Sequence, residues 1–501
     1  MDVRTGRLVM SRIEIKSGIG LPYSVILALN GAFGIEFFVL LEHSTFLAGP
    51  AVVLSLFLCG VITMISLFSY CELGASISEV GGEYTFAKVA FGGFTSFLTG
   101  WMRWISSIAT IALSAAGFAH FFAYFFPANA TLVTILLVVI FTFISVRGTK
   151  EIDIITVATF ILVFTSLVIM GLPKVLETGG LQKFTSLQTF MPKGVPGVFA
   201  SIMYSFSMFV GARAVVAGSP QMMNPKKDLP RAILYSIAII TVLYCSVAFI
   251  VVGLTPLNQN LNQPLLTYVA ENVMGPFGGV LMSVAGLSAA LMSLTTTMMV
   301  QRSIVRGLSR DGYLPSVIGS SESRVGRYLS VGVGSIIAIL LFITGLIVFI
   351  GYISGFASLL VFALVNLSLI KLRKKKPRLD RPFRAPLYPY TPIVGVVLSV
   401  LLMLFVERSA LLLGLEFIII AIIIYHLKMV GYHRLRLAVG GANLGISGIT
   451  ALIAYMLMGG EISLPITKIF GENVPNLIIA VSLIFFISGI LNIISRKRRE
   501  V

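Results

Sequence analysis

The stretch Asn30-Gly31-Ala32-Phe33-Gly34-Ile35-Glu36 interrupts a hydrophobic segment that is otherwise long enough to cross a membrane. It puts two glycines and a carboxylate at bilayer depth, where an unpaired backbone group costs several kcal/mol. Such backbone persists only where protein, water or a bound solute satisfies it. The stretch therefore predicts a discontinuous membrane helix with a solute site at its break.

The composition around this stretch is that of an integral membrane protein. Of the 501 residues, 57% are hydrophobic and 11% are charged, and the mean hydropathy is +0.98. This leaves too little polar surface for a soluble protein. No small-residue cleavage site follows the first apolar run, so we expect no removable signal peptide.

Apolar runs of roughly 20 residues recur along the chain and predict about fourteen membrane-spanning helices. They cover residues 19–41, 47–72, 87–121, 130–147, 153–172, 195–218, 231–254, 276–303, 329–350, 351–370, 391–406, 409–427, 439–458 and 475–494. With the N-terminus inside, 30 of the 37 Lys and Arg residues fall in cytoplasmic segments, five fall outside, and Arg103 and Arg213 lie within spans. This bias predicts a multi-pass protein of the plasma membrane with both termini cytoplasmic.

Charge and cysteine usage exclude other classes. The net charge of +17 does not indicate nucleic acid, because the cations lie in short loops beside the spans, most densely over residues 371–384. They fit topology and contact with anionic lipid. Cys59, Cys71 and Cys245 lie in or at the ends of spans without paired spacing, so we expect neither a disulfide nor a metal site.

The histidines argue against an intramembrane enzyme. His43, His120, His426 and His433 lie near span ends and far apart in the sequence. They form no nucleophile–base pair and no metal constellation. We therefore expect no enzymatic activity and no cofactor.

A second interrupted segment, residues 204–213, follows five spans after the first. Two interrupted segments in corresponding positions of two halves are the sequence sign of an inverted-repeat transporter. We predict a first repeat over 19–172 (helices 1–5) and a second over 195–372 (helices 6–10). Helices 11–12 (390–430) and two extra helices (438–495) follow, and the tails are residues 1–18 and 496–501.

Several blocks, taken in order, resemble the amino acid-polyamine-organocation superfamily over about residues 15–430. Gly31–Phe38 looks like its first-helix glycine motif, and Gly81-Gly82-Glu83-Tyr84 resembles its signature after the second span. Three further blocks are similar to its later loops: 224–233, 309–315 and 381–386. The resemblance implies an amino acid permease, an all-α membrane protein with a five-plus-five inverted repeat, which works by alternating access as an antiporter or symporter.

The physics of the first break fits a zwitterionic substrate independently. Amides freed at the start of the outer half-helix favour a carboxylate, and carbonyls that end the inner half accept bonds from an ammonium. Close helix packing is the alternative role for Gly31 and Gly34. The candidate substrate-binding residues lie on the two broken helices: Asn30, Gly31, Phe33, Gly34, Ile35, Glu36, Phe206, Ser207, Phe209, Gly211 and Arg213.

Two of these residues depart from the pattern of the superfamily. Many members have glycine where this chain has Glu36, and an acid near the position of Arg213. Because intramembrane charges tend to pair, we hypothesise that Glu36 and Arg213 pair in at least one state of the transport cycle. The alternative is that Glu36 faces the substrate, which favours a cationic amine or a proton-linked cycle, while Arg213 binds lipid headgroups or carbonyls.

Three further side chains have two interpretations each. Phe206 and Phe209 match positions where the superfamily often carries aromatic gates, although a phenylalanine in a span is ordinarily core or lipid-facing. Arg103 lies in a span between Trp101 and Trp104, and we expect it to extend to the cytoplasmic interface rather than into the cavity.

The sequence leaves the coupling ion open between H+ and Na+. Some proton-coupled relatives carry a lysine midway along the fifth span, where this chain has Val163. Ser293 and Thr296 are hydroxyls of the kind that complete a sodium site, and Glu36 is the candidate proton carrier. Hydroxyls in membrane helices more often bond their own turn, and uncoupled exchange is a third alternative.

Charges on the predicted cytoplasmic loops are either an inner gate or solvated topology signals. They include residues 224–231, Glu79, Glu83, Arg310 and Asp311. We predict a transporter whose partners are a small amino acid or amine and the lipid bilayer. A sensor of amino acids that does not transport, and a channel for small solutes, are the alternatives.

Overall fold

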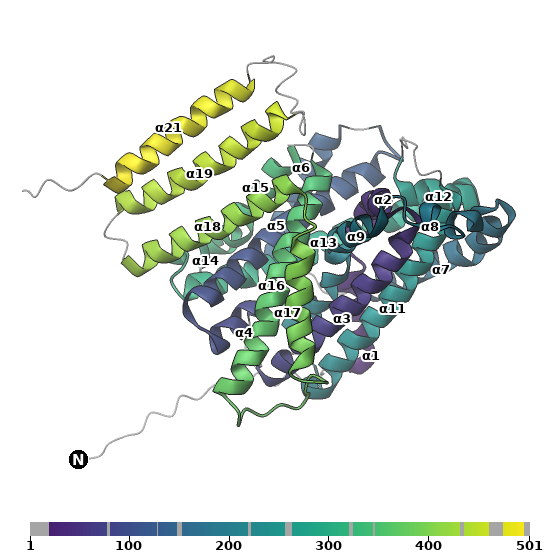
Figure 1. The fold of residues 1–501 in the computed structure, drawn as a ribbon, viewed down its shortest axis with the longest axis horizontal. Coiled ribbons are helices and arrows are strands. Elements are labelled where there is room, and N and C mark those ends of the chain that lie inside the picture. The colour runs from purple at the N-terminus through teal and green to yellow at the C-terminus, as the bar shows by residue number, and fades with distance from the viewer. Residues whose placement is uncertain are drawn as a thin grey trace, which may run out of the picture.

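The computed structural model of the chain is all-helical (Figure 1). It describes residues 20–77, 81–127, 129–147, 153–218, 222–255, 263–319, 324–343, 346–430, 435–459 and 474–494. The predicted tails, 1–18 and 496–501, and Glu79 lie outside the described residues.

The N-terminal part of the chain forms a first set of helices. They are α1 (Leu21–Ala32), α2 (Ile35–Ala48), α3 (Val52–Ser76), α4 (Glu83–Ala90), α5 (Gly93–Phe122), α6 (Ala130–Arg147) and α7 (Asp153–Glu177), with a 3₁₀ turn η1 (Gly49–Ala51). The turn joins α2 to α3 at Gly49, whose φ of +63° favours glycine.

The middle of the chain forms a second set. It contains η2 (Gly180–Phe184), α8 (Leu187–Phe190), α9 (Gly194–Phe209), η3 (Val210–Ala214), α10 (Val215–Gly218), α11 (Pro225–Leu254), α12 (Leu265–Met274), α13 (Pro276–Arg310), α14 (Ser316–Gly319), α15 (Arg324–Ile343) and α16 (Ile347–Lys375). Among the described residues, the helices that follow are α17 (Tyr390–Met403), α18 (Arg408–Val430), α19 (Leu435–Met458) and α21 (Val474–Ile494).

The helices are those of a multi-pass membrane protein. Within the described residues, 10 helices are long and apolar enough to cross a membrane, and shorter apolar helices accompany them. The number of fourteen spans stays a prediction, and the helix bounds differ clearly from the predicted ones at residues 87–121. There the chain turns at Gly92 and Gly93, both with positive φ, so α4 is separate and the long helix α5 begins only at Gly93.

The core of the molecule lies around α5 and α16. In the most apolar 18-residue stretch of α5 and of α16, 83% of the residues are buried, compared with 28% in α18 and in α19. The helix α5 packs against α13, α15 and α16. Peripheral helices expose large apolar side chains such as Ile169 on α7 and Val242 on α11, as expected of surfaces that face lipid. The helices α19 and α21 pack on each other at one edge of the molecule (Figure 1).

Candidate functional site

Two residues, Phe33 and Gly34, interrupt the first membrane helix. Phe33 has φ −74° and ψ 54°, and Gly34 has φ −80° and ψ 166°, so neither is helical. The helix α1 therefore ends at Ala32 and α2 begins at Ile35, inside the predicted stretch. Each end leaves backbone groups without an intrahelical partner.

The carboxylate of Glu36 lies over the amide end of this break. Glu36 is in the first turn of α2, and a Cβ placed on Gly34 would overlap its Oε2. Ser293 of α13 donates a hydrogen bond to Oε2 at 3.4 Å, and Thr110 of α5 also lies beside the carboxylate. Free amides and the helix dipole stabilise an anion there. The chain's own carboxylate therefore occupies the position predicted for a substrate carboxylate.

The carbonyl end of the break is covered by Tyr244 of α11. Its hydroxyl donates a hydrogen bond of 2.8 Å to the carbonyl oxygen of Ala32. Its ring stacks on Phe37, with the centroids 3.8 Å apart, and the ring of Phe33 packs against Phe160 at 5.6 Å. Each end of the break is thus covered by a side chain of this protein in this conformation.

The second interruption lies directly against the first. The α-helix continues through Phe209, later than the start predicted for the break, and becomes 3₁₀ over Val210–Ala214. A Cβ on Gly211 would overlap the carbonyl oxygen of Gly31 and lie 2.9 Å from Cα of Ala32. Only glycine allows the two backbones to approach so closely. The fold therefore brings the two interrupted helices together.

The other predicted residues of the sixth span are buried in α9. Phe206 packs edge-on against Phe362 at 5.1 Å, and Phe209 packs against Tyr244 at 5.5 Å. The hydroxyl of Ser207, which is 3% exposed, has no hydrogen-bond partner among the residues that the structure describes. Asn30, Ile35 and Ser293 are also buried, and Thr296 lies one turn further along α13, partly buried.

Arg213 pairs with Glu83 rather than Glu36. Its Nε lies 3.3 Å from Oε1 of Glu83, and the same oxygen lies 3.4 Å from Nε of Arg103. The hydroxyl of Tyr70 accepts a hydrogen bond from Arg213 at 3.4 Å. We call these four residues the Glu83 cluster. A pair between Glu36 and Arg213 is not present in this conformation and stays a prediction for other states.

Arg103 is largely buried and paired with Glu83, and its position relative to the cytoplasmic interface stays a prediction. Its side chain is 11% exposed, and those of Glu83 and Arg213 are 12% and 3% exposed. The carboxylate of Glu83, which begins α4, attracts Arg103 inward because a buried cation needs a partner. Sequence position alone did not reveal this partner.

Two other ion-pair groups connect the first set of helices to the second. Lys88 of α4 binds Asp311, at the end of α13, at 2.7 Å, and Tyr84 donates to the same carboxylate. Glu72, at the end of α3, binds Arg373 of α16 through both oxygens, at 2.8 and 2.6 Å. Charges of the predicted loops therefore do form contacts between the two halves.

Burial raises the pKa of Asp311, but hydrogen bonds from Lys88 and Tyr84 outweigh it, so the pKa lies below its ordinary value. Asp311 is therefore ionised at neutral pH and its pair with Lys88 is intact there.

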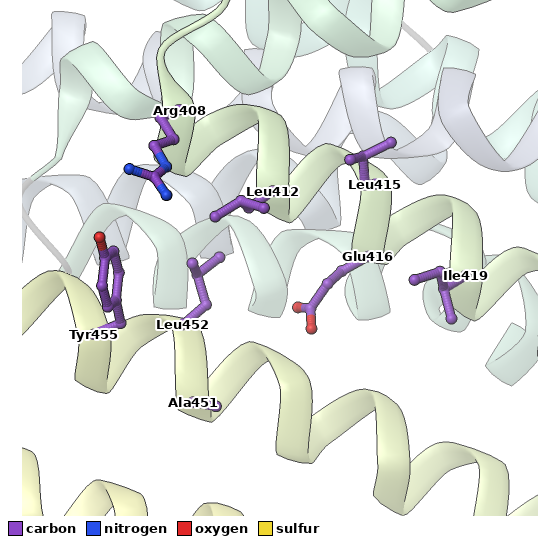
Figure 2. A pocket seen from close by; sticks show the side chains of 8 residues that line it. All are labelled: Arg408, Leu412, Leu415, Glu416, Ile419, Ala451, Leu452 and Tyr455. Atoms are coloured by element: carbon purple, nitrogen blue, oxygen red, sulfur yellow. The ribbon is translucent and has the colours of Figure 1, made fainter.

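A separate pocket of about 520 Å³ lies between α18 and α19, away from the break (Figure 2). Arg408 and Glu416 extend into it from α18, and a Cβ on Gly448 of α19 would overlap the carboxylate of Glu416. The other lining residues are mostly apolar: Leu412, Leu415, Ile419, Ala451, Leu452 and Tyr455. The carboxylate of Glu416 is therefore packed against α19.

Sequence reasoning missed Tyr244 and Thr110. Tyr244 lies in the apolar run of α11, where a buried phenol needs a hydrogen-bond partner, and this was the available signal. Thr110 follows Arg103 and Ser107 along one face of α5, and Arg103 donates to Ser107 at 3.3 Å.

The chain is similar to known transport proteins. A family model described as amino acid permease matches residues 19–428. The branched-chain amino acid permease BcaP of Bacillus subtilis (strain 168) is 24% identical over 444 residues, which cover 83% of this chain and 93% of that protein. The methylthioribose transporter of the same bacterium is 26% identical over 386 residues, covering 70% and 79%. The gamma-aminobutyric acid permease of Escherichia coli (strain K12) is 24% identical over 414 residues, covering 78% and 89%.

Proposed function

Since this chain belongs to the amino acid permease family, we propose that it is a secondary transporter that carries amino acids or related amines by alternating access. The relatives named above carry branched-chain amino acids, methylthioribose and gamma-aminobutyric acid by their names. The amino acids among them share a primary amino group and a carboxylate.

The substrate site of this proposal lies where the two interrupted helices meet. The single observation that carries it is the contact between Gly211 and the backbone of Gly31, because it joins the two breaks beside Glu36. Helix breaks at membrane depth are tolerated where they line a cavity or bind a solute. The candidate binding residues are those predicted from the sequence on α1, α2, α9 and η3, to which we add Tyr244.

The closed gate of this proposal is made of the Glu83 cluster and the pairs Lys88–Asp311 and Glu72–Arg373. In the Glu83 cluster and in Lys88–Asp311, a residue of the predicted first repeat contacts one of the second. Glu72 of the first repeat contacts Arg373, which directly follows the predicted second repeat. With the five-plus-five inverted repeat and both termini in the cytoplasm of a plasma-membrane protein, these contacts close the cytoplasmic side. They separate when the cavity opens inward.

The coupling ion of this proposal binds near Glu36. Glu36 is the candidate carrier of a proton, and Ser293 with Thr296 are candidate ligands for sodium. The hydrogen bond from Ser293 to Glu36 supports this position, because it joins the candidate proton carrier to a candidate sodium ligand. Imposed gradients of each ion across vesicles distinguish the two ions.

Uptake into proteoliposomes tests the transport proposal. The full chain is reconstituted into vesicles. Labelled L-leucine, L-lysine or gamma-aminobutyric acid is then added outside them, with and without sodium and proton gradients. Saturable uptake that unlabelled substrate competes would support the proposal. Saturable binding without flux would replace it with the sensor, and a current that does not saturate would replace it with the channel.

A further inference from the structure

We propose that the substrate is recognised by its amino group, which binds Glu36, and that the first-helix break provides no binding place for a substrate carboxylate. The inference rests on the proposed transport function and deepens it, because it names the chemical class of the substrate. The preferred substrates are primary organic amines, and an α-carboxylate adds nothing to their binding.

The first step is that the anion position of the break is already filled. A helix start offers free amides and a positive dipole end to a single anion. The Glu36 carboxylate folds back over Gly34, so closely that a Cβ there would overlap it, and it takes a hydrogen bond from Ser293. A substrate carboxylate at the same amides would meet both this side chain and its charge.

The second step is that Glu36 has no cation of its own. Among the described residues, no Lys, Arg or His nitrogen lies within 4.0 Å of its carboxylate. The groups that face it are Ser293 from α13, Thr110 from α5 and Tyr244 from α11, with Arg103 as the charged group within electrostatic range. Arg103 is committed to Glu83 at 3.4 Å. A carboxylate at membrane depth tends to pair, and an ammonium supplies the missing partner.

The third step is that a second polar group at the junction of the two breaks is free. The hydroxyl of Ser207 is 3% exposed and has no hydrogen-bond partner within the described part of the chain. Ser207 lies one turn before Gly211, the residue that touches Gly31. Ser207 lies near the C-terminal end of α9, which leads directly into this contact. An ammonium has three donors to satisfy, and this hydroxyl can accept one of them.

The fourth step is that the other cations of the site do not provide a carboxylate position. Arg213 binds Glu83 at 3.3 Å and Tyr70 at 3.4 Å, and its guanidinium lies 5.2 Å from the ring of Phe362. Recruiting it would leave Glu83 with only Arg103. A buried pair that loses one partner is strongly destabilised. The recognition therefore falls on the amino group alone.

Three matched ligands test this specificity on the reconstituted full chain. They are L-leucine, 3-methylbutylamine, which lacks its carboxylate, and 4-methylpentanoate, which lacks its amino group; L-lysine and cadaverine form a second pair. We expect each amine to compete for uptake within about threefold of its amino acid, or more tightly. We expect 4-methylpentanoate to compete at least tenfold more weakly.

Two substitutions of Glu36 separate its charge from its volume. Glu36→Gln removes the charge but still covers the amides, so the affinity for the amines should fall at least tenfold with no gain for 4-methylpentanoate. Glu36→Gly uncovers the amides, so it should lose the amines and gain 4-methylpentanoate at least tenfold. Glu36→Asp should keep the preference for amines, and Glu416→Gln, which removes a different carboxylate within a span, should leave all affinities unchanged. Melting temperatures in detergent identify variants that do not fold.

The outcomes separate this inference from the transport proposal. If none of the five ligands is taken up or bound, the proposed function fails. If L-leucine or L-lysine is transported while the matched amine does not compete, and Glu36→Gln leaves the amino acid affinity unchanged, the inference is overturned and transport stands. A gain of 4-methylpentanoate binding in Glu36→Gly would support the inference, and saturable uptake of L-leucine or L-lysine would support transport.

Discussion

Gly211 shows at the scale of a single residue why the two interrupted helices need particular side chains. Gly211 lies in the 3₁₀ helix η3 and has no positive φ. Its Cα nevertheless faces the carbonyl oxygen of Gly31 with no room for a methyl group. The cause is backbone-to-backbone contact, which side-chain motion cannot relieve.

We predict that Gly211→Ala abolishes or strongly reduces uptake and lowers the stability by about 1–3 kcal/mol, as overpacking does. Gly332→Ala on α15 is the matched control, because a Cβ there meets nothing within 4 Å. Uptake and melting temperature of both variants check this. Equal behaviour of the two would show that the breaks do not adjoin in the membrane.

The hydroxyl of Tyr244 is a second residue whose effect can be isolated. Tyr244→Phe keeps the ring stacked on Phe37 and removes the donor to Ala32. We expect the free energy of unfolding to fall by about 1 kcal/mol. We also expect an altered apparent affinity for the substrate, since the carbonyl oxygen of Ala32 loses its hydrogen-bond donor. Tyr235→Phe on the same helix, where the side chain is 53% exposed, should change neither. A normal melting temperature and affinity in Tyr244→Phe would remove this tyrosine from the site.

At the scale of elements, Glu72 joins α3 to α16 and to the segment that follows α16. It binds Arg373 twice, contacts Arg381 at 3.2 Å, and accepts a bond of 2.7 Å from the backbone N–H of Ala385. Glu72 is 1% exposed. Because it has several partners, one carboxylate fixes three parts of the chain.

We expect Glu72→Gln to destabilise the protein by about 3–5 kcal/mol, because it leaves buried arginines without their counter-charge. Asp380→Asn is the matched control, since it breaks the pair Lys226–Asp380, whose side chains are 60% and 77% exposed. That change should cost less than about 1 kcal/mol. Thermal unfolding in the same detergent compares the two. Similar melting temperatures would contradict a structural role for Glu72.

At the scale of the whole molecule, α19 and α21 stand apart from the helices that carry the site. They lie beyond the residues that match the family, 19–428. They pack on each other, and α19 packs on α18. By contrast α18 packs on α5 and α16, and Trp101 of α5 donates a hydrogen bond of 3.0 Å to the carbonyl oxygen of Phe417.

We predict that a chain shortened after Val430 retains uptake within about twofold, because it keeps every contact of the breaks and of the Glu83 cluster. A chain shortened after Glu407 also loses α18 and exposes apolar surface of α5, so it should fail to fold or transport. Expression as a monodisperse protein and uptake per molecule measure both. Loss of uptake in the longer variant would assign α19 and α21 a part in transport.

The sequence predicted the class, the positions of most helices and the place of the first break. Each of these depends on local properties: hydropathy over a span, and glycine and charge at membrane depth. It predicted α4 and α5 as one span because hydropathy does not register the positive φ of Gly92 and Gly93. It predicted that the second break begins at residue 204, but the chain stays α-helical until Phe209.

By itself, the sequence determined that this is a multi-pass helical membrane protein whose first membrane helix is interrupted, since both follow from residue order alone. Only the tertiary structure decided which groups meet. Arg213 and Arg103 share Glu83, Tyr244 reaches Ala32, and Gly211 lies against Gly31. These partners are more than 15 residues apart, so their distance is set by how whole helices pack, and a difference of one turn or one helix face would pair each of them with another residue.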